Sequence, residues 1–342
     1  MGATLAFIGD VMLGRGVNGM IGAESPEWFW GDTLEILRSA DAVIANLECA
    51  ITSHRRPWLR TPKVFHFAAD PPAAAVLQAA GVDYVSLANN HVLDFETEGL
   101  LDTLHHLDEA GIARAGAGAT WAEAAAAAVI EAGEVTVGIL SATDNEPAFA
   151  AGGDSPGTYY MRIAPNPATL QALDAAIDDL RRRGADLVVL SLHWGPNRVT
   201  RPPETFRRFA QAALDCGVDV IHGHSAHIFQ GVAVSRGRPI LYDTGDFIDD
   251  YAIDPDLHND WSFLFLLDLE DRRPRRLRML PVELDFARVR LATGHTFQAI
   301  RERMTLLCEA LDTDVTATDQ GLEIALGQPP RSEASHGRPR PG

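Results

Sequence analysis

Apolar segments of strand length alternate with amphipathic segments along the first two thirds of the chain. Residues 97–110, 168–184 and 204–216 place apolar side chains at helical spacing. The apolar runs end in turn residues and have the length of buried strands; they cover 3–10, 42–48, 83–90, 135–143, 186–195 and 219–225. Strands that alternate with helices in this way predict a layered α/β fold.

The pattern changes after residue 238. Segments 239–247, 261–270 and 276–284 follow one another with no helical segment between them, which predicts antiparallel strands. A last helix is expected over about 296–311, and the alanine-rich stretch 122–128 predicts one more helix. The tail 328–342 is polar and rich in proline, which predicts disorder, so we expect a single domain over 1–327.

Polar side chains close the apolar runs. A lone polar residue at a strand end is ordinarily a turn residue, but here such residues end several separate strands. They are Asp10, Asn46 with Glu48, Asn90 with His91, His193, His224 with His227, and a sixth cluster of Asp243 with Asp246. Active sites of α/β folds lie beyond the carboxyl ends of strands, so we expect these side chains to converge. The set is rich in oxygen and lacks a thiolate motif, which favours a hard or borderline divalent ion such as Ca²⁺, Mg²⁺ or Mn²⁺.

Composition narrows the choice of partners. The net charge is −18 and Lys63 is the single lysine, so nucleic acid and acidic polymers are poor partners. Three widely spaced cysteines are typical of a reducing compartment. The first apolar run stops at Asp10 and no later run has the length of a membrane span, so we expect a cytoplasmic protein that does not associate with membranes.

Several motifs occur in an order that resembles the CapA family of poly-γ-glutamate biosynthesis proteins: GDVMLGR, NLE, K-x-F-x-F, ANNHVLD, HWG, GHSAHIFQG and YDTGDFIDDY. That family is similar to calcineurin-like metallophosphatases. The resemblance implies a four-layer α/β/β/α sandwich with the active site at the carboxyl ends of the strands and one or two divalent ions. By position it places the metal ligands at Asp10, Glu48, Asn90, His193, His224 and His227. It also implies that His91 is an acid–base group oriented by Asp94.

The chain departs from the metallophosphatase pattern at several of these positions. Met12 stands where the phosphatases carry the histidine of Asp-x-His, Glu48 replaces an aspartate, and Gly-His-x-His is stretched over 223–227. These changes make a single ion with water ligands plausible. His295, at the start of the last predicted helix, stands where soluble members of the family often carry an acidic residue. If that segment folds over the strand ends, His295 becomes a second imidazole with Asp10 as its carboxylate partner.

Three functions fit these features. The first is hydrolysis with metal-activated water. The second is epimerisation, because the family resemblance extends to a lasso-peptide biosynthesis enzyme that inverts the Cα of the C-terminal residue of a precursor peptide. Inversion needs proton-transfer groups on two faces, for which His91–Asp94 and His295–Asp10 are the candidates. The third is a non-enzymatic capsule-assembly role. The altered ligands and the acidic charge favour the epimerase, with a ribosomal precursor peptide as substrate.

Overall fold

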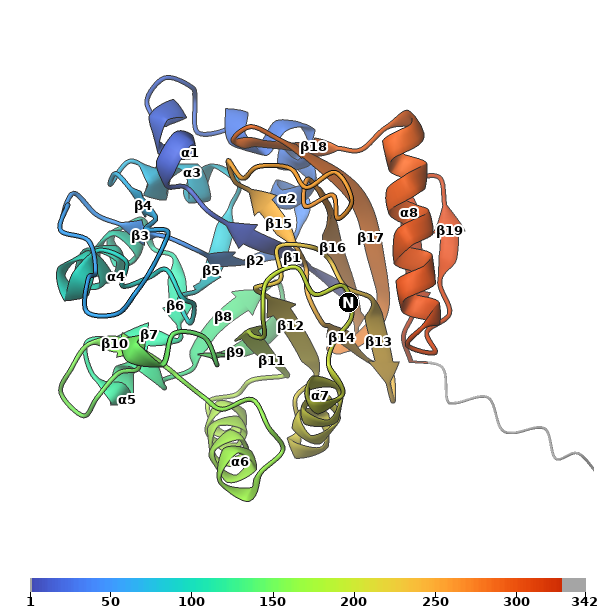
Figure 1. Ribbon diagram of the computed structural model, residues 1–342. Coiled ribbons are helices and arrows are strands. Elements are labelled where there is room, and N and C mark those ends of the chain that lie inside the picture. Colours follow the sequence, from blue (N-terminus) through green and yellow to red (C-terminus); the bar gives the residue numbers. More distant parts are fainter. Residues whose placement is uncertain (1, 328–342) are drawn as a thin grey trace, which may run out of the picture.

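Two β-sheets stacked face to face form the centre of the protein (Figure 1). The structure is a computed structural model that describes residues 2–327. The first sheet has the order β19-β20-β17-β16-β1-β2-β5-β6. Its strands are β1 (Gly2–Val11), β2 (Ala42–Leu47), β5 (Val82–Ser86), β6 (Ala113–Ala115), β16 (Trp261–Glu270), β17 (Arg273–Asp285), β19 (Thr316–Thr318) and β20 (Gly321–Ala325). Two short strands attach to it: β15 (Asp246–Ile248) pairs with β1 and β18 (Arg288–Leu291) with β17.

The second sheet has the order β13-β14-β12-β11-β9-β8. Its strands are β8 (Ala128–Ala132), β9 (Val135–Thr143), β11 (Leu187–His193), β12 (Val220–His224), β13 (Val232–Ser235) and β14 (Arg238–Leu241). Two small two-stranded sheets lie outside these layers, β3 (Ala50–Ile51) with β4 (Ala68–Ala69) and β7 (Ala117–Gly118) with β10 (Gly157–Thr158).

Three apolar clusters hold the layers together. Between the sheets, side chains from alternate positions of both pack against one another, among them Leu5, Phe7, Ile44, Val137, Ile139 and Val189. The outer face of the first sheet is covered by α2 (Leu34–Ser39), α3 (Ala73–Ala79) and α4 (Glu96–Ala110), and that of the second by α6 (Pro167–Arg182) and α7 (Glu204–Cys216). The central strands β1, β2, β11 and β12 therefore bury both faces along most of their length. The predicted four-layer α/β/β/α sandwich is confirmed.

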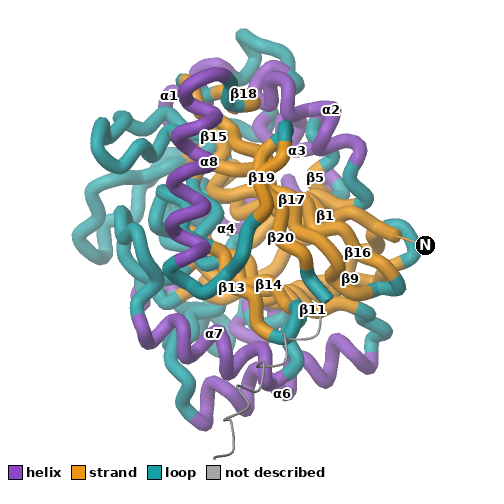
Figure 2. The backbone as a smooth tube through the Cα atoms, turned by 90° about the vertical axis from the view of Figure 1, so that its right-hand side faces the viewer, coloured by secondary structure: helices purple, strands orange, loops and turns teal. Residues whose placement is uncertain are grey.

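The remaining helices lie at the margins. These are α1 (Arg15–Met20), α5 (Trp121–Ala124), α8 (Gly294–Glu309) and the 3₁₀ turns η1 (Trp28–Thr33) and η2 (Pro147–Phe149). Figure 2 shows α8 running alongside the β17–β20 end of the first sheet. The helix predicted over 122–128 is wrong beyond Ala124, because the chain enters β8 at Ala128, where Ile130 and Ala132 are drawn into the core between the sheets. The disorder predicted for 328–342 falls outside the described residues.

The arrangement of strands fixes where polar strand ends meet. In the first sheet β1, β2 and β5 are parallel, and in the second β9, β11, β12 and β14 are parallel. The register pairs Asp10 with Asn46 on β2 and with Asp246 on β15, and it pairs His193 with His224. Carboxyl ends of both sheets thus open at one edge of the sandwich.

Gly9 sets the spacing between β1 and the segment that leads into β15. A Cβ atom at Gly9 would lie 1.8 Å from the backbone oxygen of Gly245, so the two strands can approach only because no side chain stands there. We expect Gly9→Ala to lower the free energy of unfolding by at least about 2 kcal/mol, because the backbone itself must move. Gly19→Ala is the matched control: a Cβ atom there meets nothing within 4 Å, so an exposed helical position gains helix propensity. Urea unfolding of both variants measures the difference, and equal stabilities would contradict the close-approach explanation.

Candidate metal centre and acid–base pair

Asp10 occupies the centre of the polar strand ends. It is fully buried, and its Oδ1 accepts a hydrogen bond from the Nδ2 of Asn46 at 2.8 Å. Two groups of potential metal ligands share it. One consists of Asp10, His193 and His224; the other consists of Asp10, Glu48, His227 and Asp246. Within each group the ligand atoms all lie within 4.8 Å of one another. Asp10 is therefore placed to contact an ion in either group.

Several buried oxygens have no hydrogen-bond partner among residues 2–327, and their positions show whether a cation would fit here. Such atoms gather at this edge of the sandwich: Asp10 Oδ2, both Oε atoms of Glu48, Asn90 Oδ1 and Asp246 Oδ2. Leaving carboxylate oxygens buried and unpaired is costly unless a cation or donor meets them. A bound divalent ion is the partner that an oxygen-rich set of this kind fits.

The pKa values of these carboxyl groups are shifted because several ionisable side chains are buried close together. Burial and then the charge of Asp10 raise the pKa of Glu48 well above its ordinary value. Burial also raises the pKa of Asp246, against the lowering effect of His227. For Asp10, burial would raise the pKa, but the His227 imidazole close to its carboxylate and then His193 and His224 lower it below its usual range. A cation among these groups would relieve the repulsion and favour the ionised carboxylates.

The histidines differ in their charge. Burial lowers the pKa of His193 to about 3, and burial with the neighbouring His193 lowers that of His224. Both are therefore neutral imidazoles, the form that binds metals. Burial would also lower the pKa of His227, but the carboxylates of Asp246 and Glu48 raise it well above its ordinary value. His227 Nδ1 lies 2.9 Å from Asp246 Oδ1 and 3.4 Å from Asp10 Oδ2.

The loop that carries His227 has an uncommon backbone. Ser225 and His227 have φ values of 114° and 58°, a region that residues other than glycine rarely adopt. Ala226 is fixed between them because its N–H donates to Asp243 Oδ2 at 2.7 Å. This turn accommodates the extra residue of the stretched Gly-His-x-x-His sequence. Asp243 holds the loop, which delivers the His227 imidazole to Asp10 and Asp246.

His91 and Asp94 form a hydrogen-bonded pair beside the ligand groups. His91 Nδ1 lies 2.5 Å from Asp94 Oδ2, and His91 Nε2 lies 4.0 Å from Glu48 Oε1. The His91 ring stacks on Phe67 with ring centroids 4.0 Å apart, and the backbone N–H of Phe67 donates to Asp94 at 2.7 Å. Burial and then the charge of Lys63 lower the pKa of His91 well below its ordinary value. The pair thus presents Nε2 toward the ligand groups while Nδ1 is engaged.

The side chain of Lys63 contacts the His91–Asp94 pair. Its Nζ lies 3.3 Å from Asp94 Oδ1 and donates to the backbone oxygen of Asn90 at 2.6 Å. Burial raises the pKa of Asp94 to about 7, against the lowering effect of Lys63. The single lysine of the chain therefore orients buried side chains.

A cavity of about 320 Å³ opens onto His91 and His227. Its wall is largely aromatic, and two arginines stand in it; the lining residues include Arg15, Phe65, Phe67, Arg198, Tyr251 and Asn259. The Arg15 guanidinium lies 5.6 to 5.9 Å from the ring centroids of Phe65, Phe67 and Tyr251, and its Nε lies 3.4 Å from Asp250 Oδ1. The hydroxyl of Tyr251 is buried without a hydrogen-bond partner among the described residues. A substrate that enters here meets rings and positive charge before it meets the ligand groups.

Most of the residues predicted from the sequence lie together. Asp10, Glu48, His193, His224 and His227 belong to the two ligand groups. Asn90 belongs to neither group, yet its unpartnered Oδ1 is buried next to His91 in the chain. Sequence reasoning included Asp246 in the converging polar set but not among the six metal ligands, and it assigned no role to Lys63, Arg15 or Tyr251. The acidic cluster around Asp246 is visible in the sequence, but only the pairing of β15 with β1 places Asp246 beside Asp10.

The predicted pairing of His295 with Asp10 is wrong. His295 is exposed at the start of α8, and it is absent from the lining of the cavity that contains His91. Asp10 instead lies with Asn46, His224 and His227. The reason is that α8 packs against β17, β20 and β13, so its first turn does not close over the strand ends.

Comparison with known proteins identifies the family. Residues 4–251 match the model of the bacterial capsule synthesis protein family PGA_cap. The chain belongs to this family. It is 33% identical over 334 residues to a probable polyglutamine synthesis accessory protein of Mycobacterium tuberculosis, covering 92% of this chain and 86% of that protein. It is also 29% identical to the capsule biosynthesis protein CapA of Bacillus anthracis, over 72% of this chain and 60% of CapA.

Both ligand groups and the His91–Asp94 pair fall within the PGA_cap match. His295 lies beyond it. Among solved structures, the NAD nucleotidase of Haemophilus influenzae matches with a TM-score of 0.44 and 13% identity, over 90% of this chain and 63% of that one. This likeness is too distant to bear on activity. Across residues 2–327, no helix has both the length and the apolar character needed to cross a membrane.

Proposed function

We propose that the protein is a metal-dependent hydrolase that acts on an anionic substrate during synthesis of a polyglutamate-type polymer. The observation that carries the proposal is the sharing of Asp10 by two ligand groups directly beside the His91–Asp94 pair. A divalent ion, when bound, supplies Lewis-acid polarisation and lowers the pKa of water. Mn²⁺ suits the set because it accepts both carboxylate and imidazole ligands. The polymer class rests on the CapA-type motifs of the sequence, whose family resemblance is to poly-γ-glutamate biosynthesis. The names of the relatives point to polyglutamine synthesis in M. tuberculosis and to capsule biosynthesis in B. anthracis.

The residues of the chain divide the remaining work. His91 holds or moves a proton at Nε2, because Nδ1 is engaged with Asp94. Asp94 fixes the tautomer and the ring orientation, with Lys63 and the N–H of Phe67 holding the carboxylate in turn. Arg15 and Arg198 offer cations to an anionic substrate, while Phe65 and Phe67 flank its apolar part. On a chain with a net charge of −18, these two arginines favour an acidic substrate at this cavity, although each is also paired with an aspartate at 3.4 Å.

Peptide epimerisation is a second candidate, and Tyr251 is the observation that favours it. Inversion at a Cα atom needs proton-transfer groups on two faces of the substrate. The Tyr251 ring stands 5.8 Å from that of Phe67, which stacks on His91, and its hydroxyl has no partner among the described residues. In this candidate Tyr251 takes the place that the sequence assigned to His295. The substrate is then a ribosomal precursor peptide.

One assay in D₂O separates the two functions. Protein stripped with EDTA and shown by elemental analysis to hold no metal is expected to be inactive, and Mn²⁺ is expected to restore activity. The substrates are a γ-linked oligoglutamate, a phosphate monoester and a peptide with a free carboxylate, followed by mass spectrometry. Cleavage of an acidic substrate supports hydrolysis; deuterium gained at one Cα without cleavage transfers the assignment to epimerisation. Full activity of verified metal-free protein would contradict both.

A further inference from the structure

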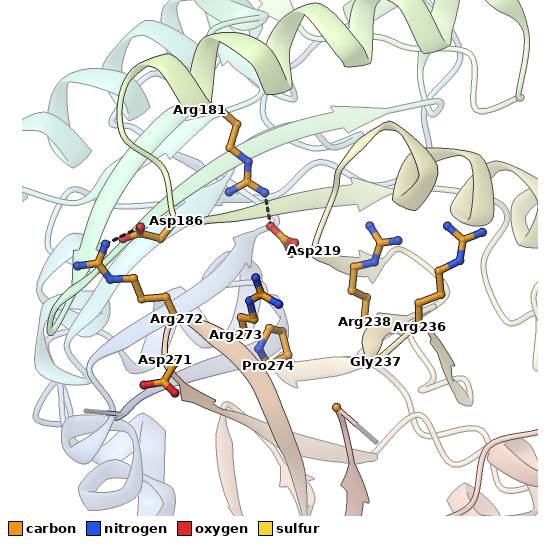
Figure 3. A pocket seen from close by; sticks show the side chains of 11 residues that line it. Arg181, Asp186, Asp219, Arg236, Gly237, Arg238, Asp271, Arg272, Arg273 and Pro274 are labelled. Atoms are coloured by element: carbon orange, nitrogen blue, oxygen red, sulfur yellow. Dashed lines mark hydrogen bonds and ion pairs between the residues drawn. The ribbon is translucent and has the colours of Figure 1, made fainter. Parts of the chain in front are cut away.

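An arginine-rich cleft lies at the edge of the sandwich opposite the metal centre. It has a volume of about 590 Å³ and is formed where the parallel strands of the second sheet begin, by the end of α6, the segment before β12, and the turns β13–β14 and β16–β17. Its charged lining residues are Arg181, Asp186, Asp219, Arg236, Arg238, Asp271, Arg272 and Arg273. Figure 3 shows these side chains arranged around a common space. Arginines thus outnumber carboxylates here, on a protein whose net charge is −18.

Part of this arginine set has an architectural explanation. Arg181 is paired with Asp219 at 2.6 Å and also donates to the backbone oxygen of Ala185. Arg238 donates to the backbone oxygens of Leu214 and Val218, at the carboxyl end of α7. Cations at helix carboxyl ends stabilise the helix, so these two arginines need no ligand. The carbonyl oxygens do not neutralise Arg238, however, and its Nη2 and Nε remain available.

The other arginines are not explained in this way, because they come from two hairpin turns. Arg236 and Arg272 have φ values of 53° and 61°, in two-residue turns that favour Gly, Asn or Asp. Arg273, next to Arg272, makes no hydrogen bond or ion pair among residues 2–327 that would hold its guanidinium. Arg236 is paired with Asp215 at 2.9 Å and Arg272 with Asp186 at 2.8 Å, so the turns hold these guanidinium groups at the cleft beside Arg273. An anion in the cleft would accept hydrogen bonds from the N–H donors that remain free.

We propose that this cleft binds a compact ligand with several anionic oxygens, a polyphosphate or a polycarboxylate. Guanidinium groups recognise both through paired N–H donors. The volume matches a small-molecule site. Arg273 and the Nη2 and Nε of Arg238 supply free donors. Arg236, whose Nη1 is paired with Asp215 at 2.9 Å, adds its other N–H groups. Asp186 and Asp219 fix Arg272 and Arg181 at the rim. This site is separate from the metal centre and does not depend on the function proposed for it.

Calorimetric titration of metal-free full-length protein tests the site. The probes are inorganic pyrophosphate and citrate, with inorganic phosphate as the less charged comparison; metal-free protein is used because the probes also chelate ions. We expect phosphate to bind more weakly than at least one of the others. Arg273→Ala should weaken binding about tenfold, the loss typical of one charge-assisted hydrogen bond, and Arg236→Ala/Arg273→Ala about 100-fold. Tighter binding of pyrophosphate assigns a polyphosphate, and tighter binding of citrate assigns a polycarboxylate.

Two control variants keep this test specific. Arg290→Ala removes an exposed arginine, paired with Glu283 at 3.1 Å, from β18, and should leave binding unchanged. Arg15→Ala reports on anions that enter the cavity at the metal centre: binding that is lost in Arg15→Ala but kept in Arg273→Ala belongs to that cavity and not to the arginine-rich cleft. The proposal is overturned if neither probe binds the wild-type protein, or if the double variant binds like wild type. It is equally overturned if Arg290→Ala loses as much affinity as Arg273→Ala.

Discussion

Asp10→Asn is expected to remove metal binding from both ligand groups and to lower turnover by more than about 100-fold, the loss that even indirect damage to a metal site can cause. The shape of the side chain is kept, and its Oδ1 still accepts from Asn46. Only the negative charge is lost, together with the Oδ2 atom, which makes no hydrogen bond among residues 2–327. Because Asp10 belongs to both groups, one substitution should affect all bound metal.

Thermal unfolding distinguishes this role from a structural one. A ligand that binds only the folded state at about 100 times its Kd adds about 2.7 kcal/mol, so Mn²⁺ should raise the melting temperature of the wild-type protein. Asp10→Asn should melt at or above the temperature of metal-free wild type, since repulsion with Glu48 is relieved, and should not respond to Mn²⁺. Asp83→Asn is the matched control: Asp83 accepts from the N–H of Val43 near the amino end of β2, far along the strand from the centre. Its variant should bind metal normally. A wild-type metal response in Asp10→Asn would refute the shared-ligand assignment.

The fold followed from the sequence because its signals are local. Runs such as 186–195 and 219–225 are apolar on both faces, which is what a strand buried between a second sheet and a helix layer requires. The amphipathic stretch 204–216 became α7 with the same bounds, ending at Gly217 in the left-handed conformation. The error at 122–128 has a local cause too: alanine favours helices in isolation, but sheet pairing of β8 with β9 outweighed that preference.

The site was only partly predictable, because its last members depend on contacts between distant segments. Asp246 reaches Asp10 through a parallel pairing of β15 with β1 across more than 200 residues, which no local pattern encodes. Lys63 lies in a loop, where only the finished structure shows that it meets Asp94. The prediction for His295 was wrong because it, too, depended on contacts between distant segments. Its place depends on where α8 docks, and the apolar residues Ile300 and Met304 anchor that helix in the core between the sheets.

His91→Ala is expected to lower turnover by about 10²–10⁴-fold while metal content stays at the wild-type value, since general acid–base groups contribute in that range. The imidazole is held by Asp94 and Phe67, and its Nε2 faces the ligand groups without being a member of them. His105→Ala, which removes an exposed imidazole from α4, and His295→Ala should both keep nearly normal turnover. A loss in His295→Ala as large as that in His91→Ala would restore the two-histidine scheme for epimerisation.

Asp94 should act through His91, and a double-variant cycle tests this. Asp94→Asn can still accept a hydrogen bond, but it weakens the hold on the Nδ1–H tautomer and leaves Lys63 without its carboxylate partner. We expect a smaller loss of turnover than in His91→Ala, with substrate KM nearly unchanged. Combining the two substitutions should cost little more than His91→Ala alone, because residues that act as one unit are not additive. If the two losses instead multiply, Asp94 contributes independently of His91, and the orienting role assigned to its carboxylate is wrong.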